Sequence, residues 1–372
     1  MNSQNHCKKW IIEDAQVEYV LWTGRATSAL YSLLKVLFSS TMKVVVPNNV
    51  CFSVIAAIRF AGMEPEILDI DPESQSISPA LLNKLSAAVK RIVLYPHMYG
   101  IVHRNFLEVQ KICTRRNWFL IEDRAQSMGA SINGMVSGPA NAILYSFGHG
   151  KIVDCGYGGA LAVPNKELLA QSTTVYQHLT DVSLQNSNDE KIYGSLFKQI
   201  YAIWQGNGNK DFSGLFNGLI SGFQGIFLHK RDDIPFSQIE ASLNQLVDNV
   251  NRRAYAMQRL KAACEKEGFS FIEHPQESVY WRFNLLLPPN HRDSVMKKLH
   301  ENHCHASSWF PSVDRFIAKR IDPNKYPISD EFEKRILNLW VSGVESGYIE
   351  KVIRLICRYM ISVQEERKKK AN

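Results

Sequence analysis

KVVVPNNVCFSVIAAIRFAGMEPEILDIDPESQSISPALLNKLSAAVKRIVLYPH, residues 43–97, decides the fold of this chain. Short runs rich in β-formers, KVVVP, EPEILDID and RIVLYPH, alternate with the helical patterns SVIAAIRFAG and PALLNKLSAAV. This alternation is the rhythm of βαβ units. Because most of the strand runs show little polar alternation, they predict an α/β fold in which helices cover both faces of a mostly parallel sheet.

The same rhythm continues on both sides of this stretch. Upstream, VEYVLW (17–22) predicts a strand. Downstream, a helix is predicted at FLEVQKICTRR (106–116), and strands are predicted at WFLIED (118–123), AILYSFG (142–148) and GGALAVP (158–164). Sheets of this kind bind ligands at the carboxyl ends of their strands, so the chemistry is expected there.

Two domains are expected in the 372 residues, a large one over 1–245 and a smaller C-terminal α/β domain over 246–372. Residues 165–230 lack strand signals and predict an insertion of helices and loops in the large domain. Residues 235–267 predict one continuous helix that ends before Gly268. Beyond it, strands are expected at 278–288, 305–310 and 337–343, and helices at 292–303 and 347–366.

The composition, 45% apolar and 21% charged, indicates a globular protein, and the pattern of cysteines indicates the cytoplasm. The N-terminus lacks the sections of a signal peptide, and no run approaches the roughly 18 apolar residues that span a membrane. Seven scattered cysteines without a CxxC pair indicate reduced thiols and no metal site. The net charge of +7 is spread along the chain, which disfavours nucleic acid as a partner and suits an anionic small molecule.

The first segment with candidate chemistry is the turn TGRATS, residues 23–28, between a predicted strand and a strong helical pattern. A glycine-containing turn at a helix N-terminus presents free backbone N–H groups to an anion such as phosphate. The alternative is that Thr23 or Thr27 merely caps the helix.

The second candidate is Asp123, at the end of the apolar strand WFLIED. A buried carboxylate needs a cationic partner, because an unpaired buried charge costs several kcal/mol. That partner is either Arg124 or another arginine, or the protonated ring nitrogen of a cofactor.

The third candidate is Lys151, in SFGHGKIVDCGYGGALAV (146–163), where Ser146 ends a strand and glycines bracket the turn. A loop lysine is usually solvated, but a buried one has the lowered pKa that imine chemistry requires. Asp123 and Lys151 each follow a strand and should converge on one crevice. An anion turn, a carboxylate and an amine together match the needs of pyridoxal 5'-phosphate (PLP).

Six segments give the chain a family resemblance, in order: TGRATSAL (23–30), VPNNVCFSVIAAIRFAGMEPEILDID (46–71), HMYG (97–100), IEDRAQSMGAS (121–131), SFGHGKIVDCGYGGAL (146–161) and IEASLNQL (239–246). With these motifs the chain resembles the DegT/DnrJ/EryC1/StrS family of fold-type I, PLP-dependent sugar aminotransferases. The resemblance implies a homodimer whose two subunits share the active site.

The resemblance also implies a role for each matching residue. Lys151 would form the Schiff base with PLP and shuttle protons, and Asp123 would pair with the pyridine nitrogen. Gln126 would lie by the ring hydroxyl of PLP. Ser146 and the backbone at Arg25 and Ala26 would hold the phosphate.

Three positions depart from the family pattern. Arg25 replaces a threonine of many relatives and could add charge to the phosphate site. At Cys51 many relatives have an aromatic residue that stacks on the pyridine, so either Cys51 or Phe52 contacts the ring here. Arg231 falls where relatives supply an asparagine to the partner subunit's phosphate site, and Arg25 and Arg231 together could replace that contact.

The reaction implied is transfer of an amino group from glutamate or glutamine to a keto-sugar, nucleotide-linked, in polysaccharide or amino-sugar biosynthesis. His149 and Trp309 are candidate substrate contacts. Lys151 disfavours the related sugar dehydratases, which have histidine in its place. Two alternatives stay open: an aminotransferase for a cyclitol or another small ketone, and a PLP-binding regulatory protein with little turnover.

Overall fold

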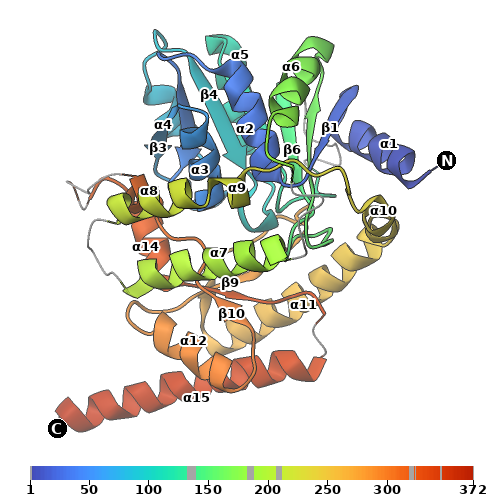
Figure 1. The fold of residues 1–372 in the computed structure, drawn as a ribbon. Helices are drawn as coiled ribbons and strands as arrows, with labels where there is room; N and C mark the ends of the chain where they lie inside the picture. Colours follow the sequence, from blue (N-terminus) through green and yellow to red (C-terminus); the bar gives the residue numbers. More distant parts are fainter. Residues whose placement is uncertain are drawn as a thin grey trace.

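The computed structural model describes residues 2–131, 140–181, 188–206, 212–317, 322, 324–343 and 346–371. A seven-stranded sheet and a four-stranded sheet organise the chain (Figure 1). The strands of the large sheet are β1 (Tyr19–Thr23), β2 (Lys43–Pro47), β3 (Glu64–Leu68), β4 (Arg91–Pro96), β5 (Phe119–Asp123), β6 (Ala142–Ser146) and β7 (Gly159–Val163).

The large sheet is mostly parallel, which confirms the prediction from residues 43–97. Its order is β1-β7-β6-β5-β4-β2-β3, and among the described strands of this sheet only β7 runs in the opposite direction to the others. Pro96 lies opposite Asp123 in the β4–β5 pair, and Ser146 lies opposite Gly159 in the β6–β7 pair. The carboxyl ends of the parallel strands therefore share one edge of the sheet, where β7 begins.

Helices cover both faces of this sheet, which explains why its strands are almost continuously apolar. Along β4, Ile92 and Leu94 pack into one core cluster, and Val93 and Tyr95 pack into the other. The first cluster includes residues of α2 (Ala26–Leu37), α3 (Phe52–Phe60) and α6 (Lys166–Gln177). The second includes residues of α1 (Ser3–Ala15), α4 (Pro79–Lys84), α5 (Asn105–Arg116) and α10 (Phe236–Asn244). A short 3₁₀ turn, η1 (Met98–Gly100), follows β4.

The small sheet is antiparallel and has the order β10-β11-β9-β8. Its strands are β8 (Ser270–Phe271), β9 (Phe283–Leu286), β10 (Ala306–Ser307) and β11 (Ile336–Leu339). A third hydrophobic cluster joins this sheet to α11 (Leu246–Glu267), α12 (Arg292–Glu301) and α15 (Ser346–Ala371). Two further helices lie between β10 and β11 in the sequence, α13 (Asp314–Ile317) and α14 (Pro327–Arg335).

The described part of residues 165–230 is helical and contains α6, α7 (Asn188–Gly206), α8 (Ser213–Gly222) and α9 (Gln224–Phe227). In Figure 1, α7 and α8 run across the molecule between the two sheets. The predicted continuous helix over 235–267 is wrong in one respect. It breaks at Gln245 into α10 and α11, and Leu246, the first residue of α11, packs closely against Gly129.

Two predicted strands are much shorter than expected. The strand predicted over 278–288 is reduced to β9, because Tyr280 has a φ of 53°, which interrupts the extended chain. The strand predicted over 305–310 is reduced to β10, and Trp309 then joins an aromatic cluster with Trp281. Packing of these large rings has overridden the local β-pattern.

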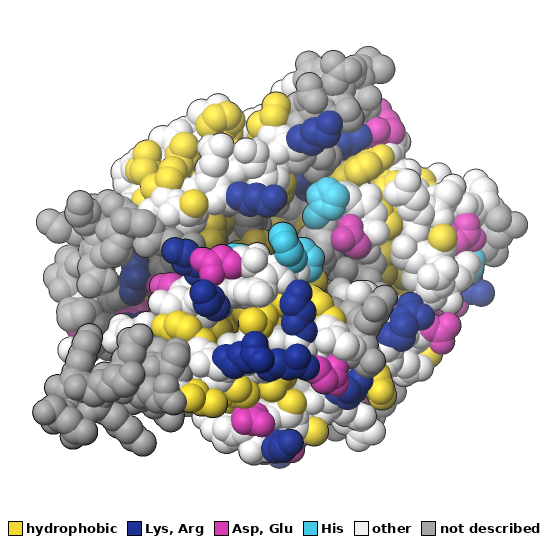
Figure 2. All heavy atoms as spheres, turned by 90° about the horizontal axis from the view of Figure 1, so that it is seen from below, with side chains coloured by type: hydrophobic (Ala, Val, Ile, Leu, Met, Phe, Trp, Pro, Cys, Tyr) yellow, Lys and Arg dark blue, Asp and Glu magenta, His cyan; other side chains and the backbone are white. Residues whose placement is uncertain are grey.

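The surface shows mixed chemistry on the face seen in Figure 2. Lys and Arg side chains are interspersed there with Asp, Glu and hydrophobic side chains. None of the helices in the described ranges combines the length and the apolar character needed to cross a lipid bilayer.

Candidate functional site

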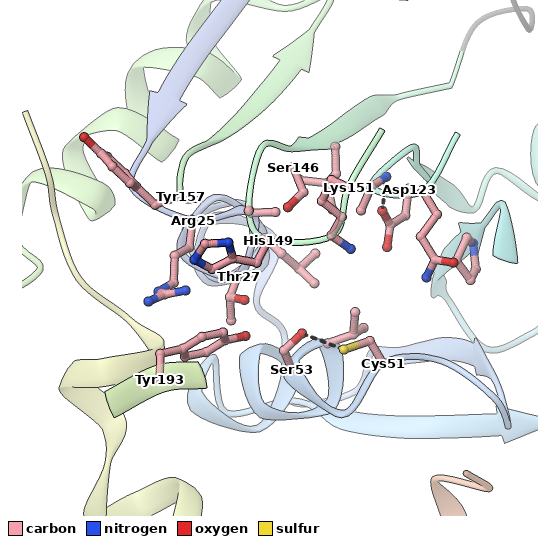
Figure 3. A pocket seen from close by; sticks show the side chains of 18 of the residues that line it. Arg25, Thr27, Cys51, Ser53, Asp123, Ser146, His149, Lys151, Tyr157 and Tyr193 are labelled. Atoms are coloured by element: carbon pink, nitrogen blue, oxygen red, sulfur yellow. Dashed lines mark hydrogen bonds between the residues drawn. The ribbon is translucent and has the colours of Figure 1, made fainter. Parts of the chain in front are cut away.

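A cavity of about 650 Å³ opens where the parallel strands of the large sheet end. Successive strand ends each supply a wall residue, in the order Arg25 after β1, Cys51 after β2, His97 after β4, Asp123 on β5 and Ser146 on β6. The turn between β6 and β7 adds a lysine that reaches inward (Figure 3). The volume lies in the range of about 300–1,000 Å³ that is typical of small-molecule sites.

The lysine on that turn is Lys151, and its turn is fixed at several points. The indole of Trp281 donates to the carbonyl of Gly150 (2.5 Å), and the amide of Asn249 donates to the carbonyl of Ile152 (2.9 Å). Burial lowers the pKa of the Lys151 amine, which forms no ion pair within the described residues. An amine with a lowered pKa is a better nucleophile at neutral pH.

Asp123 lies on the same wall as Lys151 (Figure 3). One of its carboxylate oxygens accepts a hydrogen bond from the backbone N–H of Ala125 (2.9 Å). Burial raises the pKa of Asp123, and the nearby charge of Lys151 only partly offsets this effect. The site therefore favours a cationic ligand group beside Asp123, since such a group would stabilise the carboxylate.

The alternative that Asp123 pairs with Arg124 is wrong. Arg124 lies on the opposite face of the strand end, where its guanidinium contacts Glu122 (2.9 Å) and Asp14 (2.6 Å). Alternation of side chains along β5 explains this separation. Over the described ranges, no arginine forms an ion pair with Asp123. Its carboxylate lines the cavity and can pair with a ligand there.

The buried pair beneath Asp123 belongs to a larger network. His97 Nε2 lies 2.8 Å from Glu122 Oε1, and the hydroxyl of Tyr145 donates to Asp14 (2.5 Å). Burial alone would raise the pKa of Glu122, but the charge of Arg124 and the contact with His97 outweigh it and lower that pKa to about 2. Glu122 is therefore an anion, and its contacts with Arg124 and His97 hold the end of β5 on the face opposite to Asp123.

The N-terminus of α2 offers a place for a phosphate. The helix begins at Ala26 with Arg25 as its N-cap, and no side chain caps it within the described structure. The hydroxyl of Thr23 instead donates to the Arg25 carbonyl (2.8 Å), so the N-cap interpretation of Thr23 or Thr27 is wrong. Ala26 and Thr27, the first residues of α2, line the cavity, and the free N–H groups of a helix N-terminus suit an anion.

Side chains add polar groups at this end of the cavity. The Arg25 guanidinium lies 3.6 Å above the ring of Tyr193, a residue of α7. Ser146 and Ala26 also line the cavity, and Gly159 lets β7 pass directly beside Ala26. A guanidinium, a hydroxyl and a helix N-terminus together suit a phosphate group.

Cys51 and Phe52 take different directions at the start of α3. Cys51 is the N-cap and lines the cavity, with its Sγ 3.1 Å from Ser53 Oγ. Phe52 is 3% exposed and packs edge-on against Phe216 and Phe227 in the core. The structure thus brings Cys51, and not Phe52, to the cavity wall.

Three other predicted residues also lie on the wall. Gln126 accepts a hydrogen bond from the backbone N–H of Tyr99 (2.8 Å) through its Oε1. Trp309 stacks on Trp281, with ring centroids 6.2 Å apart, and both line the cavity. The side chain of His149 is 75% exposed, which places it at the rim.

Arg231 is the second predicted residue that does not reach this wall. Its side chain pairs with Asp233 (2.6 Å) and lies 4.0 Å above the ring of Tyr157, which does line the cavity. The hydroxyl of Tyr176 accepts hydrogen bonds from the backbone N–H groups of both Arg231 and Gly24. Arg231 therefore lies behind the 23–28 turn in its own chain.

Sequence reasoning did not single out several residues of the wall, namely Ser53, His97, Tyr157, Lys191, Tyr193, Lys198 and Trp281. His97 and Tyr157 lie inside the quoted motifs HMYG and SFGHGKIVDCGYGGAL, which could have identified them. The residues of α7 had no such signal, because that helix reaches the cavity only through tertiary packing.

The residues present fit PLP by their chemistry. A buried amine suits the aldehyde, a carboxylate that lacks a cationic partner in the described structure suits the ring nitrogen, and the N-terminus of α2 suits the phosphate. Lys151, Asp123, Ser146, Arg25 and Ala26 would hold the group.

Comparison with curated proteins finds relatives that are sugar aminotransferases. GDP-perosamine synthase of Caulobacter vibrioides is 25% identical over 157 residues, which are 42% of this chain and 42% of that protein. The dTDP-3-amino-3,6-dideoxy-alpha-D-galactopyranose transaminase of Aneurinibacillus thermoaerophilus is 23% identical over 338 residues, 85% of this chain and 78% of that protein. The chain spans about two fifths of the length of the first curated relatives that it matches.

Solved structures agree on the fold. The putative sugar aminotransferase Spr1654 from Streptococcus pneumoniae, in its PMP form, superposes with a TM-score of 0.76 at 14% identity, covering 99% of this chain and 92% of that one. The profile of the DegT/DnrJ/EryC1/StrS aminotransferase family matches residues 11–356, and members of this family depend on PLP. The chain therefore belongs to the DegT/DnrJ/EryC1/StrS aminotransferase family.

Proposed function

We propose that this chain is an aminotransferase that moves an amino group from glutamate or glutamine to a nucleotide-linked keto-sugar. The observation that carries the proposal is that Lys151, a half-buried residue whose pKa desolvation lowers, and the carboxylate of Asp123 lie in one cavity of about 650 Å³. The sugar aminotransferases among the relatives support the substrate class.

The roles of the chain's own residues follow from the geometry. PLP, when bound, supplies the electron sink that acidifies the amine-bearing carbon of a substrate. Asp123, through its negative charge, would favour the protonated form of the ring nitrogen. Lys151 Nζ would accept the proton from that carbon and deliver it to the carbon of the cofactor's aldehyde group, because its lowered pKa lets it act as base and then as acid. Trp281 and Trp309 line the cavity and give it an aromatic wall.

The arrangement of subunits is a further part of this proposal. Arg231 lies beside Tyr157 at the cavity but does not line it within its own chain. We infer a cytoplasmic homodimer that shares its active sites, with a large domain over 1–245 and a small one over 246–372. Light scattering after size exclusion should give twice the mass of the 42.4 kDa chain, and a monomer would contradict this assembly.

The test of cofactor chemistry is a comparison of two lysines of the same cavity. Purified protein with PLP should show a visible absorption band, and Lys151→Ala should abolish it. Lys198→Ala is the matched control, because Lys198 lines the cavity but is exposed, and it should keep the band.

Amino transfer is tested separately. Glutamate or glutamine should bleach the band, and a 4-keto or 3-keto nucleotide sugar should restore it and yield an amino sugar that mass spectrometry detects. A band that neither donor bleaches would sink the aminotransferase proposal and favour a regulatory PLP-binding protein. Recovery only with a cyclitol or another small ketone would overturn the sugar substrate.

A further inference from the structure

A second cavity, of about 370 Å³, adjoins the turn that carries Lys151. Its walls come from that turn, from α10 and α11, and from the segments next to β9 and β11. The charged side chains on the walls are four cationic ones and one carboxylate, namely Lys151, Arg252, Arg253, Arg282 and Asp154. This cavity is thus strongly basic.

Arg282 is the most deeply buried cation of this cavity, with 3% of its surface exposed. Its Nη1 donates to the carbonyl of Trp281 (2.8 Å), and its guanidinium lies 4.3 Å and 4.0 Å from the rings of Trp281 and Trp340. Its Nε is buried and has no hydrogen-bond partner among the described residues. A buried donor without a partner is costly, so this one points to a missing acceptor.

Arg253, a second cation of this cavity, is also buried. It is 4% exposed, and it donates to Asn249 Oδ1 (3.0 Å) and to the carbonyls of Tyr280 and Trp281 (3.3 Å each). In the part of the chain that the structure describes, it forms no ion pair with a carboxylate. Among the residues that the structure describes, two buried guanidinium groups therefore lack a counter-ion, an arrangement that destabilises the protein unless a ligand compensates it.

The one carboxylate nearby is already engaged. Asp154 accepts hydrogen bonds from the backbone N–H groups of Gly150 (2.7 Å) and Gly156 (3.0 Å). Burial and the charge of Arg253 lower the pKa of Arg282 to about 9, although Asp154 opposes this effect. Burial lowers the pKa of Arg253 to about 10, again against the effect of Asp154. Asp154 thus leaves the two guanidinium groups undercompensated.

We propose that this second cavity binds an oxyanion, a carboxylate or phosphate group, between Arg282, Arg253 and Arg252. Guanidinium groups match the geometry of both kinds of oxyanion, and two of them are preorganised here by backbone and aromatic contacts. The site is separate from the N-terminus of α2, which faces the first cavity. It goes beyond the proposed amino transfer, which uses no group of this cavity except Lys151.

The experiment is calorimetric titration of the PLP-saturated full chain, with inorganic phosphate in one arm and succinate in the other. Either probe should bind with one site per chain, and the preferred probe identifies the kind of oxyanion. Arg282→Met keeps the length of the side chain but removes the donors, and it should weaken binding by at least about tenfold. Because it removes a buried charge without a carboxylate partner, its unfolding temperature should not fall.

Three more variants test whether the anion binds in this cavity and not elsewhere. Arg252→Gln changes an exposed arginine of the cavity, is expected to fold, and should also weaken binding by about tenfold. Arg259→Gln alters an arginine of α11 outside the cavity and should change affinity less than about twofold. Arg25→Gln, in the first cavity, should leave this binding intact.

The proposal is overturned if neither probe binds, if Arg282→Met and Arg252→Gln keep wild-type affinity, or if Arg259→Gln weakens binding equally. It is also overturned if Arg25→Gln alone abolishes binding, since that result would place the anion at α2. The titration needs no turnover, so its failure is distinguishable from a failure of the proposed amino transfer.

Discussion

Gly159 lies directly against Ala26: a Cβ added to Gly159 would lie 2.3 Å from the Ala26 nitrogen, well inside contact distance. This contact seats the N-terminus of α2 on the first residue of β7, next to Ser146 of β6. The same close approach places the N-terminus of α2, the candidate phosphate site, beside the end of β6, the strand that precedes Lys151. No side chain fits between the two backbones.

Gly159→Ala should therefore destabilise the fold and weaken PLP binding together. The added methyl must push α2 away, and such overpacking costs about 1–3 kcal/mol of unfolding free energy. Chemical denaturation and PLP titration measure the two effects. Gly218→Ala is the control, because a Cβ there meets no atom within 4 Å, and it should unfold at the same temperature or slightly above it. Wild-type PLP affinity in Gly159→Ala would show that the close approach has no part in holding the phosphate.

Asp123→Asn should fold but turn over slowly. The amide keeps the size and the acceptor for the Ala125 N–H but loses the negative charge that a protonated ring nitrogen requires. Loss of one preorganised electrostatic contact costs about 10²- to 10³-fold in kcat. Single-turnover kinetics with glutamate measure the effect, and Asp248→Asn, at an exposed position of α11, is the control. A kcat within a factor of three of wild type would argue that Asp123 does not act on the ring.

Arg124→Met should be among the most destabilising substitutions in this chain. It leaves Glu122 and Asp14 as buried carboxylates without their shared cation, and breaking a buried pair in this way costs about 3–5 kcal/mol. Urea denaturation at neutral pH is the measurement. Arg115→Met, at an exposed position of α5, is the control, because its guanidinium donates a hydrogen bond to Asn83 (2.8 Å) and bridges no buried carboxylates among the described residues. Equal stability of the two variants would refute the role of the network.

The lowered pKa of Glu122 should make the stability of the fold depend on pH. Its pKa in the folded chain is about 2, below that of an unfolded glutamate near ~4.3, so its contribution is present above the unfolded value and is lost as pH falls toward 2. Glu122→Gln should flatten the stability curve in that window relative to wild type, whereas Glu108→Gln, on the exposed side of α5, should not. Parallel curves for Glu122→Gln and wild type would contradict the lowered pKa.

The sequence predicted the large sheet well because its strands are buried on both faces, so that hydrophobicity alone marks them. The candidates Asp123 and Ser146 were found for a related reason, since each is the polar last residue of such a strand, and Lys151 follows in the turn after β6. The choice between Cys51 and Phe52 depended on where α3 begins. The N-cap residue faces the cavity and the first helical residue faces the core, a difference of one position that no pattern resolves.

Distant contacts were harder to predict. Tyr193 meets Arg25 because α7 supplies part of the cavity wall, and no sequence pattern in residues 165–230 predicts that position. Trp281 was assigned to a strand, but the φ of 53° at Tyr280 removes it from the sheet and turns it to the Lys151 turn. Packing of remote elements decided both cases.

Arg25→Gln tests what the most unusual residue of the phosphate end contributes. The guanidinium adds a positive charge to the N-terminus of α2, where helix N–H groups already favour an anion. Loss of one charge-assisted contact should raise the Kd for PLP by about tenfold. Lys35→Gln is the matched control, since it removes one positive charge from an exposed position of the same helix and should leave the Kd unchanged. The Kd is measured by the growth of the visible band as PLP is added. If both variants bind PLP like wild type, Arg25 serves only to pack against Tyr193, and the phosphate is held by the backbone of α2 and Ser146 alone.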